Sequence, residues 1–514
     1  MNAMCRQNSS GMLKRLQSGS VKRTVGLVVI ALRVLSPALA AQEESVKGQD
    51  RQVRIEKALK ELKDKNPSVR AAAAEELSRL RAKEYAKEIA RLLKDADAGS
   101  QASFTVTVMN ALEPFGADGA AALIELLEDE NPRARESAAW ALQGLADRLG
   151  GGETQDVAEI LITKLEDEDY AVRLNVVYAL TRLGSRLEGE TAKRVAHRLL
   201  AKLGDESWDV RQAAPAALVA VVLRVEEATL AACLAALFTK FTSQHEGYAQ
   251  ARYAAASAYG GILSRLDQGK AEPLVRSLVA KLGEGAEVRV RQAYLMALAP
   301  TIAGLKRETG EAVAKALMER LKDRELEEFV TDQYVVQPLG ELVTRVQNPE
   351  PALILNMLFA RLLDDKESDR IRRGAGYALR PGVPRMTNEQ REKLIQLIIA
   401  DPNGADVPAP TAQLLELVAP YLDGQRAREV ALALLARFHD LDLGMRSSTI
   451  VALGTMAEHL ELEQLDVAIA RGEQTLIEDR HHFYSMEPVE HALKVLKNRK
   501  QAFGSTTPHV GQSE

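Results

Sequence analysis

The histidines near the carboxyl end are the residues of this chain that could most directly bind a metal ion. His481, His482 and His491 lie within eleven residues of one another, and imidazole nitrogens are common zinc ligands. No cysteine stands beside them, and the HExxH spacing is missing. We therefore expect a solvated terminal segment here, with no metal and no cofactor.

Other catalytic patterns are weaker still. The sequence has two cysteines, Cys5 and Cys233, and Cys233 sits in the apolar run LAACLAALF. A thiol in that setting is predicted to be a small buried hydrophobe rather than a nucleophile. GxSxG is missing, and no glycine-rich phosphate loop follows a strand, because no strand is expected. The sequence does not indicate an enzyme.

Charge argues against nucleic acid as the main partner. Residues 1–40 carry six bases and no acid, so 61 bases face 72 acids from residue 41 on, a formal balance of −11. Binding to a phosphate backbone needs the opposite sign. Protein partners are therefore the expectation.

The amino-terminal residues have the pattern of a secretory signal peptide. Two bases precede an apolar run at 25–32, and Ala38-Leu39-Ala40 follows it. This pattern predicts export to the periplasm or the extracellular space, with a mature chain that begins at Ala41. No later run of eighteen apolar residues occurs, so no transmembrane span is expected in the mature chain.

Arg33 is discordant with that prediction, because a charge beside the apolar run weakens insertion. Two alternatives stay open. The basic, serine-containing leader is also typical of an organellar transit sequence, and an uncleaved leader on a cytoplasmic protein fits as well.

These isolated residues sit within a repeat of about forty residues. Each copy reads as an apolar residue, an arginine, two variable positions, a small residue, two variable positions and usually Ala-Leu. From Arg135 to Arg291 the arginines are 38, 38, 41 and 39 residues apart. Eight copies are clear, and their arginines are Arg70, Arg135, Arg173, Arg211, Arg252, Arg291, Arg372 and Arg446.

Three degenerate copies fill the longer gaps. They place Thr105, Asp332 and Pro408 where the arginine should be. Each copy follows a second amphipathic stretch and a short acidic turn, which predicts two antiparallel helices per repeat joined by a capped turn. Such pairs bury their apolar faces only by stacking on one another.

The Asp-containing turn followed by Val-Arg, a small residue and Ala-Leu resembles the HEAT repeat, including the units of phycobilin lyase relatives. The resemblance implies an all-α, right-handed α-solenoid of about 11–12 antiparallel helix pairs, a superhelix of the HEAT/armadillo type. We expect a leader at 1–40, a linker at 41–50, the solenoid at 51–503 and a disordered tail at 504–514.

Helical geometry separates the faces of the second helix of each pair. At 100° per residue from the arginine, positions −1, 3, 6, 7 and 10 share one sector and predict the core. In one repeat these are Val172, Val176, Ala179, Leu180 and Leu183. The arginine flanks this sector. By resemblance to HEAT families it joins the acidic turns in a ladder, such as Arg173 with Asp169 or Asp167, and Arg211 with Asp209 or Asp205.

The fifth position after the arginine falls at about 140°, nearly opposite the core. Large groups occupy it in four repeats, and these are the candidate partner-binding residues: Trp140, Tyr178, Met296 and Tyr377. Such groups placed away from the core favour a contact surface. The alternative is that they cover a neighbouring repeat.

We therefore expect an exported, non-enzymatic scaffold that binds protein on a concave surface lined by the second helices. The alternative is a lyase or isomerase of the HEAT-like type, or an accessory factor of an enzyme that acts on a chromophore or a modified protein. Deoxyhypusine hydroxylases of this fold need several His-Glu pairs, and only His245-Glu246 occurs. HEAT-type DNA glycosylases need a basic face, which the charge balance opposes.

Overall fold

The computed structural model contains helices and turns and no strand in the residues that it describes. These are residues 49–95, 102–243, 251–283, 286–345, 351–364, 366–400, 411–436, 438, 441, 443–478 and 486–506. The leader and the centre of the degenerate copy at Pro408 lie outside these ranges, as do His245, His481 and His482. The predicted all-α fold of about 11–12 antiparallel helix pairs is confirmed.

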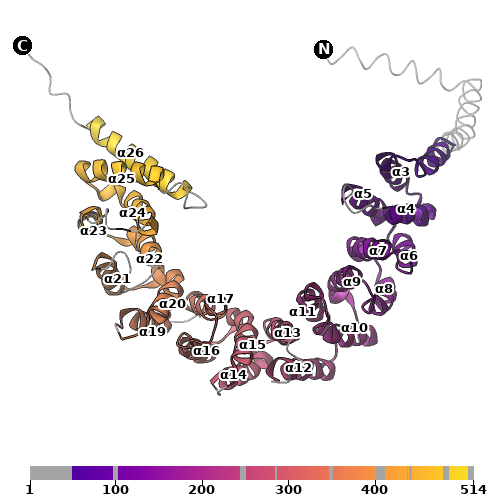
Figure 1. Cartoon of the computed structure of the whole chain (residues 1–514), viewed down its shortest axis with the longest axis horizontal. Helices are drawn as coiled ribbons and strands as arrows, with labels where there is room; N and C mark the ends of the chain where they lie inside the picture. The colour runs from indigo at the N-terminus through magenta and orange to yellow at the C-terminus, as the bar shows by residue number, and fades with distance from the viewer. Residues whose placement is uncertain are drawn as a thin grey trace, which may run out of the picture. The chain divides into compact units, whose positions relative to one another are not determined.

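The chain forms two compact units, residues 1–198 and 199–514. In unit 1 the first helices of the pairs are residues 49–61, α4 (Ala86–Arg91), α6 (Ala117–Leu126) and α8 (Gly151–Lys164). The second helices are α3 (Pro67–Arg79), α5 (Ala102–Leu112), α7 (Pro132–Leu145) and α9 (Tyr170–Leu183). First and second helices form two separate layers within this unit (Figure 1). Helix α10 (Gly189–Lys202) runs across the division.

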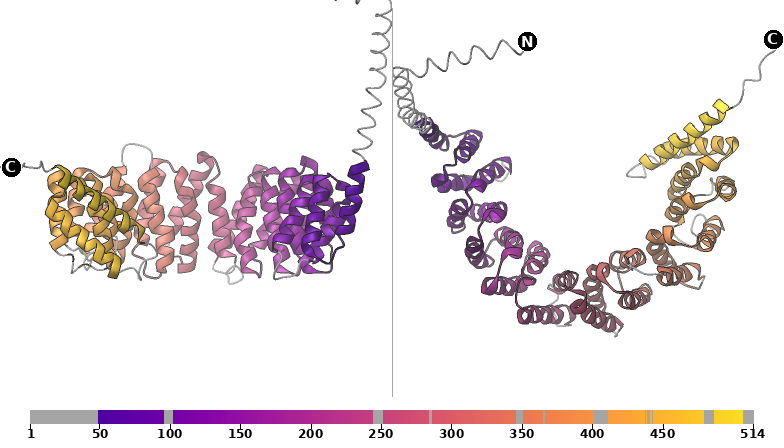
Figure 2. Two further views of the ribbon diagram at one scale, coloured as in Figure 1. Left: turned by 90° about the horizontal axis from the view of Figure 1, so that it is seen from above. Right: turned by 180° about the vertical axis from the view of Figure 1, so that it is seen from behind.

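Unit 2 repeats the same order. Its first-layer helices are α12 (Glu227–Thr242), α14 (Gln268–Gly283), α16 (Arg307–Arg320), α19 (Pro351–Leu363), α21 (Asn388–Ala400), α23 (Gly424–Ala436) and α25 (Leu462–Glu478). Its second-layer helices are α11 (Trp208–Val222), α13 (Arg252–Leu263), α15 (Val288–Leu298), α17 (Glu328–Thr331), α18 (Gln337–Arg345), α20 (Asp369–Leu379), α22 (Thr411–Val418), α24 (Leu443–Thr455) and α26 (Glu487–Thr506). Within each unit neighbouring helices lie side by side (Figure 2).

The acidic turn starts helices α3, α7 and α9 by two successive side-chain caps. In the repeat of α9, the carboxylate of Asp167 accepts from the backbone N–H of Asp169 at 3.0 Å. The carboxylate of Asp169 then accepts from the N–H of Ala171 at 2.8 Å. These bonds satisfy donors that the first helical turn leaves unpaired. The repeated acidic turn is thus a helix start signal.

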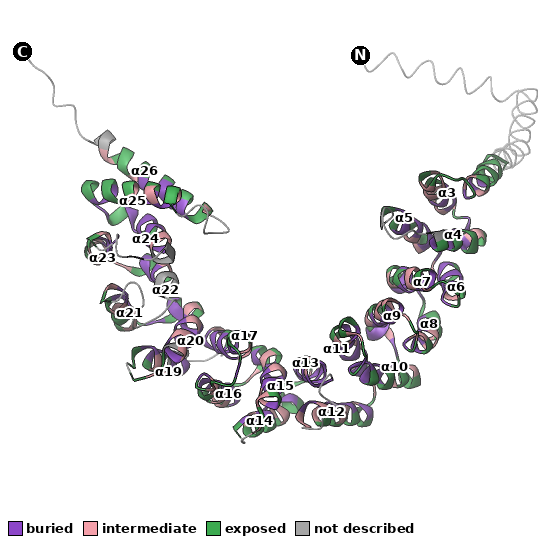
Figure 3. Ribbon diagram, in the orientation of Figure 1, coloured by how far each residue is buried: buried purple, intermediate pink, exposed green. Residues whose placement is uncertain are grey.

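The predicted core residues of α9 are buried. Val172, Val176, Ala179, Leu180 and Leu183 are each at most 1% exposed. Buried residues lie on the sides where the two layers meet, and exposed residues lie on the outer sides (Figure 3). Cys233 is also buried, as predicted, and burial raises the pKa of its thiol.

Candidate functional site

Arg135 shows how the repeated arginine is used. Its Nε and Nη2 donate to the two carboxylate oxygens of Asp167, in the next turn, at 2.8 and 2.9 Å. Its Nη1 donates to the carbonyls of Asp129 and Glu130, in its own turn, at 2.9 and 3.1 Å. The Arg135 and Asp167 side chains are only 9% and 6% exposed. Burial opposes the charge on Asp167, but the hydrogen bonds from Arg135 prevail and lower its pKa.

Other repeats use the same contacts. Arg291 donates to Asp323 at 2.7 Å and Arg446 to Glu478 at 3.2 Å, and each pair is 32 residues apart, as for Arg135 and Asp167. Arg173 and Arg211 reach the predicted Asp167 and Asp205 through the backbone carbonyls of those residues. Further donations to carbonyls that precede the helix run from Arg70 to Asp64, from Arg252 to Ser243 and from Arg372 to Leu362.

The four large residues at the fifth position lie on the second helices α7, α9, α15 and α20. Trp140 is 37% and Tyr178 45% exposed, whereas Met296 and Tyr377 are half-buried. The side of each helix that bears them points away from the core between the two layers. Helices α7 and α9 contact each other, so Trp140 and Tyr178 belong to adjacent repeats of one surface.

Three further aromatic residues escaped the sequence analysis. Tyr170, Trp208 and Phe329 are 51%, 64% and 69% exposed. Each lies three residues before the arginine position of its repeat, at about 60° on the helical wheel, on the outward side that also holds the fifth position. The analysis considered only positions after the arginine for this face. The fixed spacing was the signal that could have found them.

In unit 1 these positions form one surface, which we call the aromatic face and define as Trp140, Tyr170 and Tyr178. Exposed Val106 on α5 and half-buried Leu174 on α9 extend it. Helices α5, α7 and α9 are successive neighbours in the second layer. Contiguous exposed groups of this kind, rich in Trp and Tyr, are typical of protein contact surfaces.

The degenerate repeat at Asp332 differs in backbone as well as in sequence. Residues Asp332–Val336 form a π-helical turn between α17 and α18, and such turns are often found at functional sites. The acidic half of the ladder is retained, since Asp364 lies 32 residues on and its carboxylate accepts from the N–H of Lys366 at 3.0 Å. Only the arginine has been exchanged, for an exposed aspartate.

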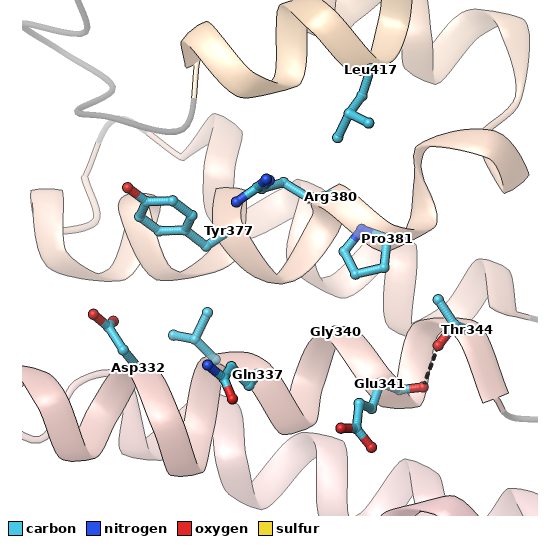
Figure 4. Close-up of a pocket in the computed structure, with 10 residues that line it drawn as sticks. Asp332, Gln337, Gly340, Glu341, Thr344, Tyr377, Arg380, Pro381 and Leu417 are labelled. Atoms are coloured by element: carbon cyan, nitrogen blue, oxygen red, sulfur yellow. Dashed lines mark hydrogen bonds between the residues drawn. The ribbon is translucent and has the colours of Figure 1, made fainter. Parts of the chain in front are cut away.

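A groove of about 700 Å³ opens beside this turn, between the segment α17–α18 and the second helices α20 and α22. Figure 4 shows Asp332, Gln337 and Glu341 on one side of it, facing Tyr377 and Arg380. Gly340, Thr344, Pro381 and Leu417 also line the groove. A Cβ on Gly340 would meet Cγ of Pro381 at 3.2 Å, so the glycine lets α18 approach the next repeat closely.

The groove has an acidic and a basic side. Partial burial, and then the nearby Glu328, raise the pKa of Asp332. The Arg380 guanidinium lies 6.0 Å from the centre of the Tyr377 ring. Burial raises the pKa of Glu416, although a hydrogen bond with Ser448 and the charge of Arg380 oppose this. The site thus combines an aromatic ring, charges of both signs and the exposed Leu417.

Metal sites and membrane-spanning helices were also sought among the described residues. No group of three or more His, Cys, Asp or Glu in the described ranges is placed to hold a metal ion. A search of the same residues finds no helix with the length and apolar character that crossing a membrane requires.

Comparisons with known proteins agree with this architecture. The family model of HEAT repeats matches residues 120–218. The crystal structure of Kap121p bound to Pho4p has a TM-score of 0.52 and 14% identity, and the match covers 87% of this chain and 50% of that one. Kap121p bound to Ste12p gives 0.51 and 12%, over 90% and 51% of the two chains. Importin beta gives 0.46 and 12%, over 88% and 73%.

The chain therefore spans about half the length of the Kap121p chains that it resembles. At these identities the likeness concerns the fold. None of the curated proteins that were compared matches the chain.

The prediction of an exported protein is wrong. The solved structures above that share the fold best are those of Kap121p bound to Pho4p and to Ste12p, and neither is the structure of an exported protein. The discordant residue in the leader is Arg33, which places a charge directly after the apolar run at 25–32 and weakens membrane insertion. The signal-peptide pattern itself lies outside the described residues. What the comparisons do bear out is the resemblance found in the repeated arginines and turns: residues 120–218 match the family model of HEAT repeats, and the chain shares the stacked-helix fold of Kap121p.

Proposed function

We propose that this chain is a non-enzymatic scaffold that binds segments of other proteins on the exposed side of its second helices. The observation that carries the proposal is the repeated exposure of large side chains on that side. Trp140, Tyr170 and Tyr178 are exposed in unit 1. In unit 2 Phe329 is exposed and Tyr377 lines a groove.

Exposure at these positions is not a by-product of helix packing. The same helices bury their opposite side fully, as Val172, Val176 and Leu180 of α9 do. Aromatic rings offer large contact area at little cost in conformational entropy, which is why they dominate the binding energy of many protein interfaces. The polar Ser257 and Gln337 hold the fifth position in other repeats and are exposed too.

The unit 2 groove supports the same function with different chemistry. Asp332 and Glu341 can accept hydrogen bonds, Arg380 can donate them, and Tyr377 and Leu417 provide apolar contact. A groove of about 700 Å³ accommodates a few side chains of a bound segment. Kap121p, which shares the fold, has been crystallised with the proteins Pho4p and Ste12p, so stacked helix pairs of this kind can serve protein binding.

The lyase or isomerase alternative is not carried further. No residue of a known lyase motif can be assigned in the sequence, and no observation among the described residues favours catalysis. The arginine ladder has a structural role in this proposal, because its charges point into the turns and not toward the exposed side of the second helices.

Affinity capture from the native host tests the proposal. The full chain should retain a defined set of proteins, and the variant Tyr377→Ala with Leu417→Ser should lose those that occupy the groove. A matched control is Ile477→Ser, an exposed apolar residue on first-layer helix α25. If both variants retain the same proteins as the unaltered chain, the groove is not a partner site. If the aromatic-face variant Trp140→Ala with Tyr178→Ala retains them as well, the second-helix side is not the binding side.

A further inference from the structure

Several pairs of neighbouring first-layer helices are joined by salt bridges. Lys87 of α4 pairs with Glu125 of α6 at 2.7 Å, for example. Further pairs join Lys164 with Glu128, Arg194 with Glu159, Lys270 with Glu227, Arg276 with Glu308, Arg361 with Glu319, and Arg426 with Glu392. These ion pairs cover the furrows between successive helices with charged side chains.

Two junctions have a hydrogen bond and no salt bridge in the described part of the chain. Gln390 of α21 donates to Asn356 of α19 at 2.7 Å, and Gln464 of α25 donates to the carbonyl of Arg428 of α23 at 3.3 Å. Helix α25 is instead tied to α26 by a salt bridge between Asp466 and Lys500 at 2.5 Å. Leu432, Leu435 and Val467 line the furrow between α23 and α25. Leu432 is 57% exposed, and Val467 is exposed too.

The space between α23 and α25 is larger than in two furrows that an ion pair crosses. The α23–α25 groove has a volume of about 580 Å³, compared with about 290 Å³ between α8 and α10 and about 210 Å³ between α4 and α6. It lies in the first layer, on helices other than those of the second-helix surface described above. An inference about it is therefore independent of the proposed function.

The charges around the apolar floor select the partner. Glu429, Glu461 and Glu463 border the groove, against the single Arg428. Glu429 is paired with Arg426 at 2.9 Å, so Glu461 and Glu463 supply most of the negative charge that a partner meets. Neither Glu461 nor Glu463 has a salt-bridge partner in the described ranges. A binding segment with an apolar stripe gains binding free energy when the stripe covers the apolar floor. Lys or Arg on either side of that stripe adds favourable electrostatic interaction with the glutamates.

We propose that the α23–α25 groove binds an amphipathic helix of a partner protein, with its apolar stripe on Leu432, Leu435 and Val467 and its basic residues against the glutamates. A helix fits because two neighbouring helices present a straight furrow, and recognition by one apolar side uses anchors at i, i+3, i+4 and i+7. With 13 residues, α23 is about 20 Å long, which sets the length of the bound helix at three to four turns.

The chain's own leader is the competing occupant, since residues 1–40 hold six bases and no acid. Its apolar residues at 25–32 are consecutive rather than spaced at helical intervals. A helix that is apolar all round would leave most of that surface exposed in a one-sided groove. An amphipathic partner helix avoids this cost.

The test measures binding of a synthetic helical probe to the full chain. The probe is an 18-residue, dye-labelled peptide of Leu and Lys with Leu at i, i+3, i+4 and i+7, and its control carries Glu in place of each Lys. We expect the Lys probe to bind with a Kd on the order of 10 μM, more weakly as salt rises, and the Glu peptide to bind at least about tenfold more weakly.

Two variants of equal charge locate the site. Leu432→Lys with Val467→Lys should weaken the Lys probe about tenfold or more. Val53→Lys with Ile477→Lys adds the same two charges at exposed residues outside the groove and should change the affinity less than about twofold. All four positions are exposed, so thermal midpoints should be unchanged, and this is checked by circular dichroism.

Three outcomes overturn the proposal. Equal weakening by both double variants shows general attraction to an acidic chain. Equal binding of the Lys and Glu peptides shows that charge does not select the partner. If a synthetic peptide of residues 13–34 displaces the Lys probe at a lower concentration than unlabelled probe does, the leader is the occupant.

Discussion

The repeat of Arg135 and the repeat of Asp332 are both followed by an acidic turn, but they differ in the residue at the arginine position and in the geometry of the second helix. In the first, a buried guanidinium joins its own turn to Asp167 of the next. In the second, the acceptor Asp364 is present, yet an exposed Asp332 stands in place of the arginine and the helix takes a π-helical turn. A groove of about 700 Å³ opens beside the second. The comparison teaches that exchange of the ladder arginine goes together with a changed helix and an open groove.

The largest expected effect is on stability in the regular repeat. Arg135→Ala should lower the free energy of unfolding by about 3–5 kcal/mol, because it leaves the buried carboxylate of Asp167 without its cation. Urea denaturation followed by circular dichroism measures this. Asp332→Ala is the matched change in the degenerate repeat and should alter stability by less than about 0.5 kcal/mol. Equal losses in the two variants would contradict the comparison.

A smaller effect is expected on binding at the aromatic face. Trp140→Ala with Tyr178→Ala should weaken partner capture by about 2 kcal/mol or more and leave the thermal midpoint nearly unchanged, because exposed rings contribute little to folding. Titration of a captured partner and a thermal melt measure the two quantities. A lowered midpoint with unaltered binding would mean that the rings cover a neighbouring repeat.

Restoring the arginine should make the repeat of Asp332 more like the repeat of Arg135. Asp332→Arg should stabilise the chain by up to about 1 kcal/mol, because it supplies a cation for the exposed Asp364. Combining it with Asp364→Asn should remove the gain, as a double-mutant cycle measures. The same substitution should reduce capture of proteins by the groove. No stabilisation, or a gain that survives Asp364→Asn, would mean that the missing arginine does not set the difference.

The smallest expected effect is a difference in how the stability of the two regions responds to low pH. The pKa of Asp167 is lowered in the folded chain, so its contribution to stability is present above its unfolded pKa and is lost as pH falls through the folded one. The pKa values of Asp332 and Glu416 are raised, so protonation of these groups favours the folded state. Between about pH 6 and about pH 3, hydrogen exchange corrected for its intrinsic rate should accelerate in α7 and α9 more than in α18 and α20. The reverse order would refute these directions.

Much of the architecture could be predicted because the same local sequence pattern recurs many times along the chain. The helix pairs, the capped acidic turns and the buried side of α9 follow from period, turn residues and helical spacing. The role of each arginine was less predictable. Arg173 donates to the carbonyl oxygens of Asp167 and Glu168, and a sequence pattern does not distinguish a backbone acceptor from a side-chain one.

The candidate sites could be predicted only in part. Tyr377 was identified from its position on the helical wheel, but the groove that it lines also needs Arg380, Leu417 and the close approach at Gly340. These residues come from three successive repeats. Leu432 and Val467 gave no signal, because exposed leucines and valines are common and what distinguishes these two is the groove between α23 and α25, which depends on packing between repeats.

The sequence by itself determined the class of fold, the layer to which each helix belongs and which side of it is buried, because those properties depend on local spacing repeated along the chain. Tertiary structure alone decided which furrows between neighbouring helices are closed by salt bridges and which stay open. That outcome depends on whether side chains more than thirty residues apart meet with opposite charge. Arg426 meets Glu392 in this way, whereas the apolar side chains of Leu432 and Val467 line a furrow that stays open.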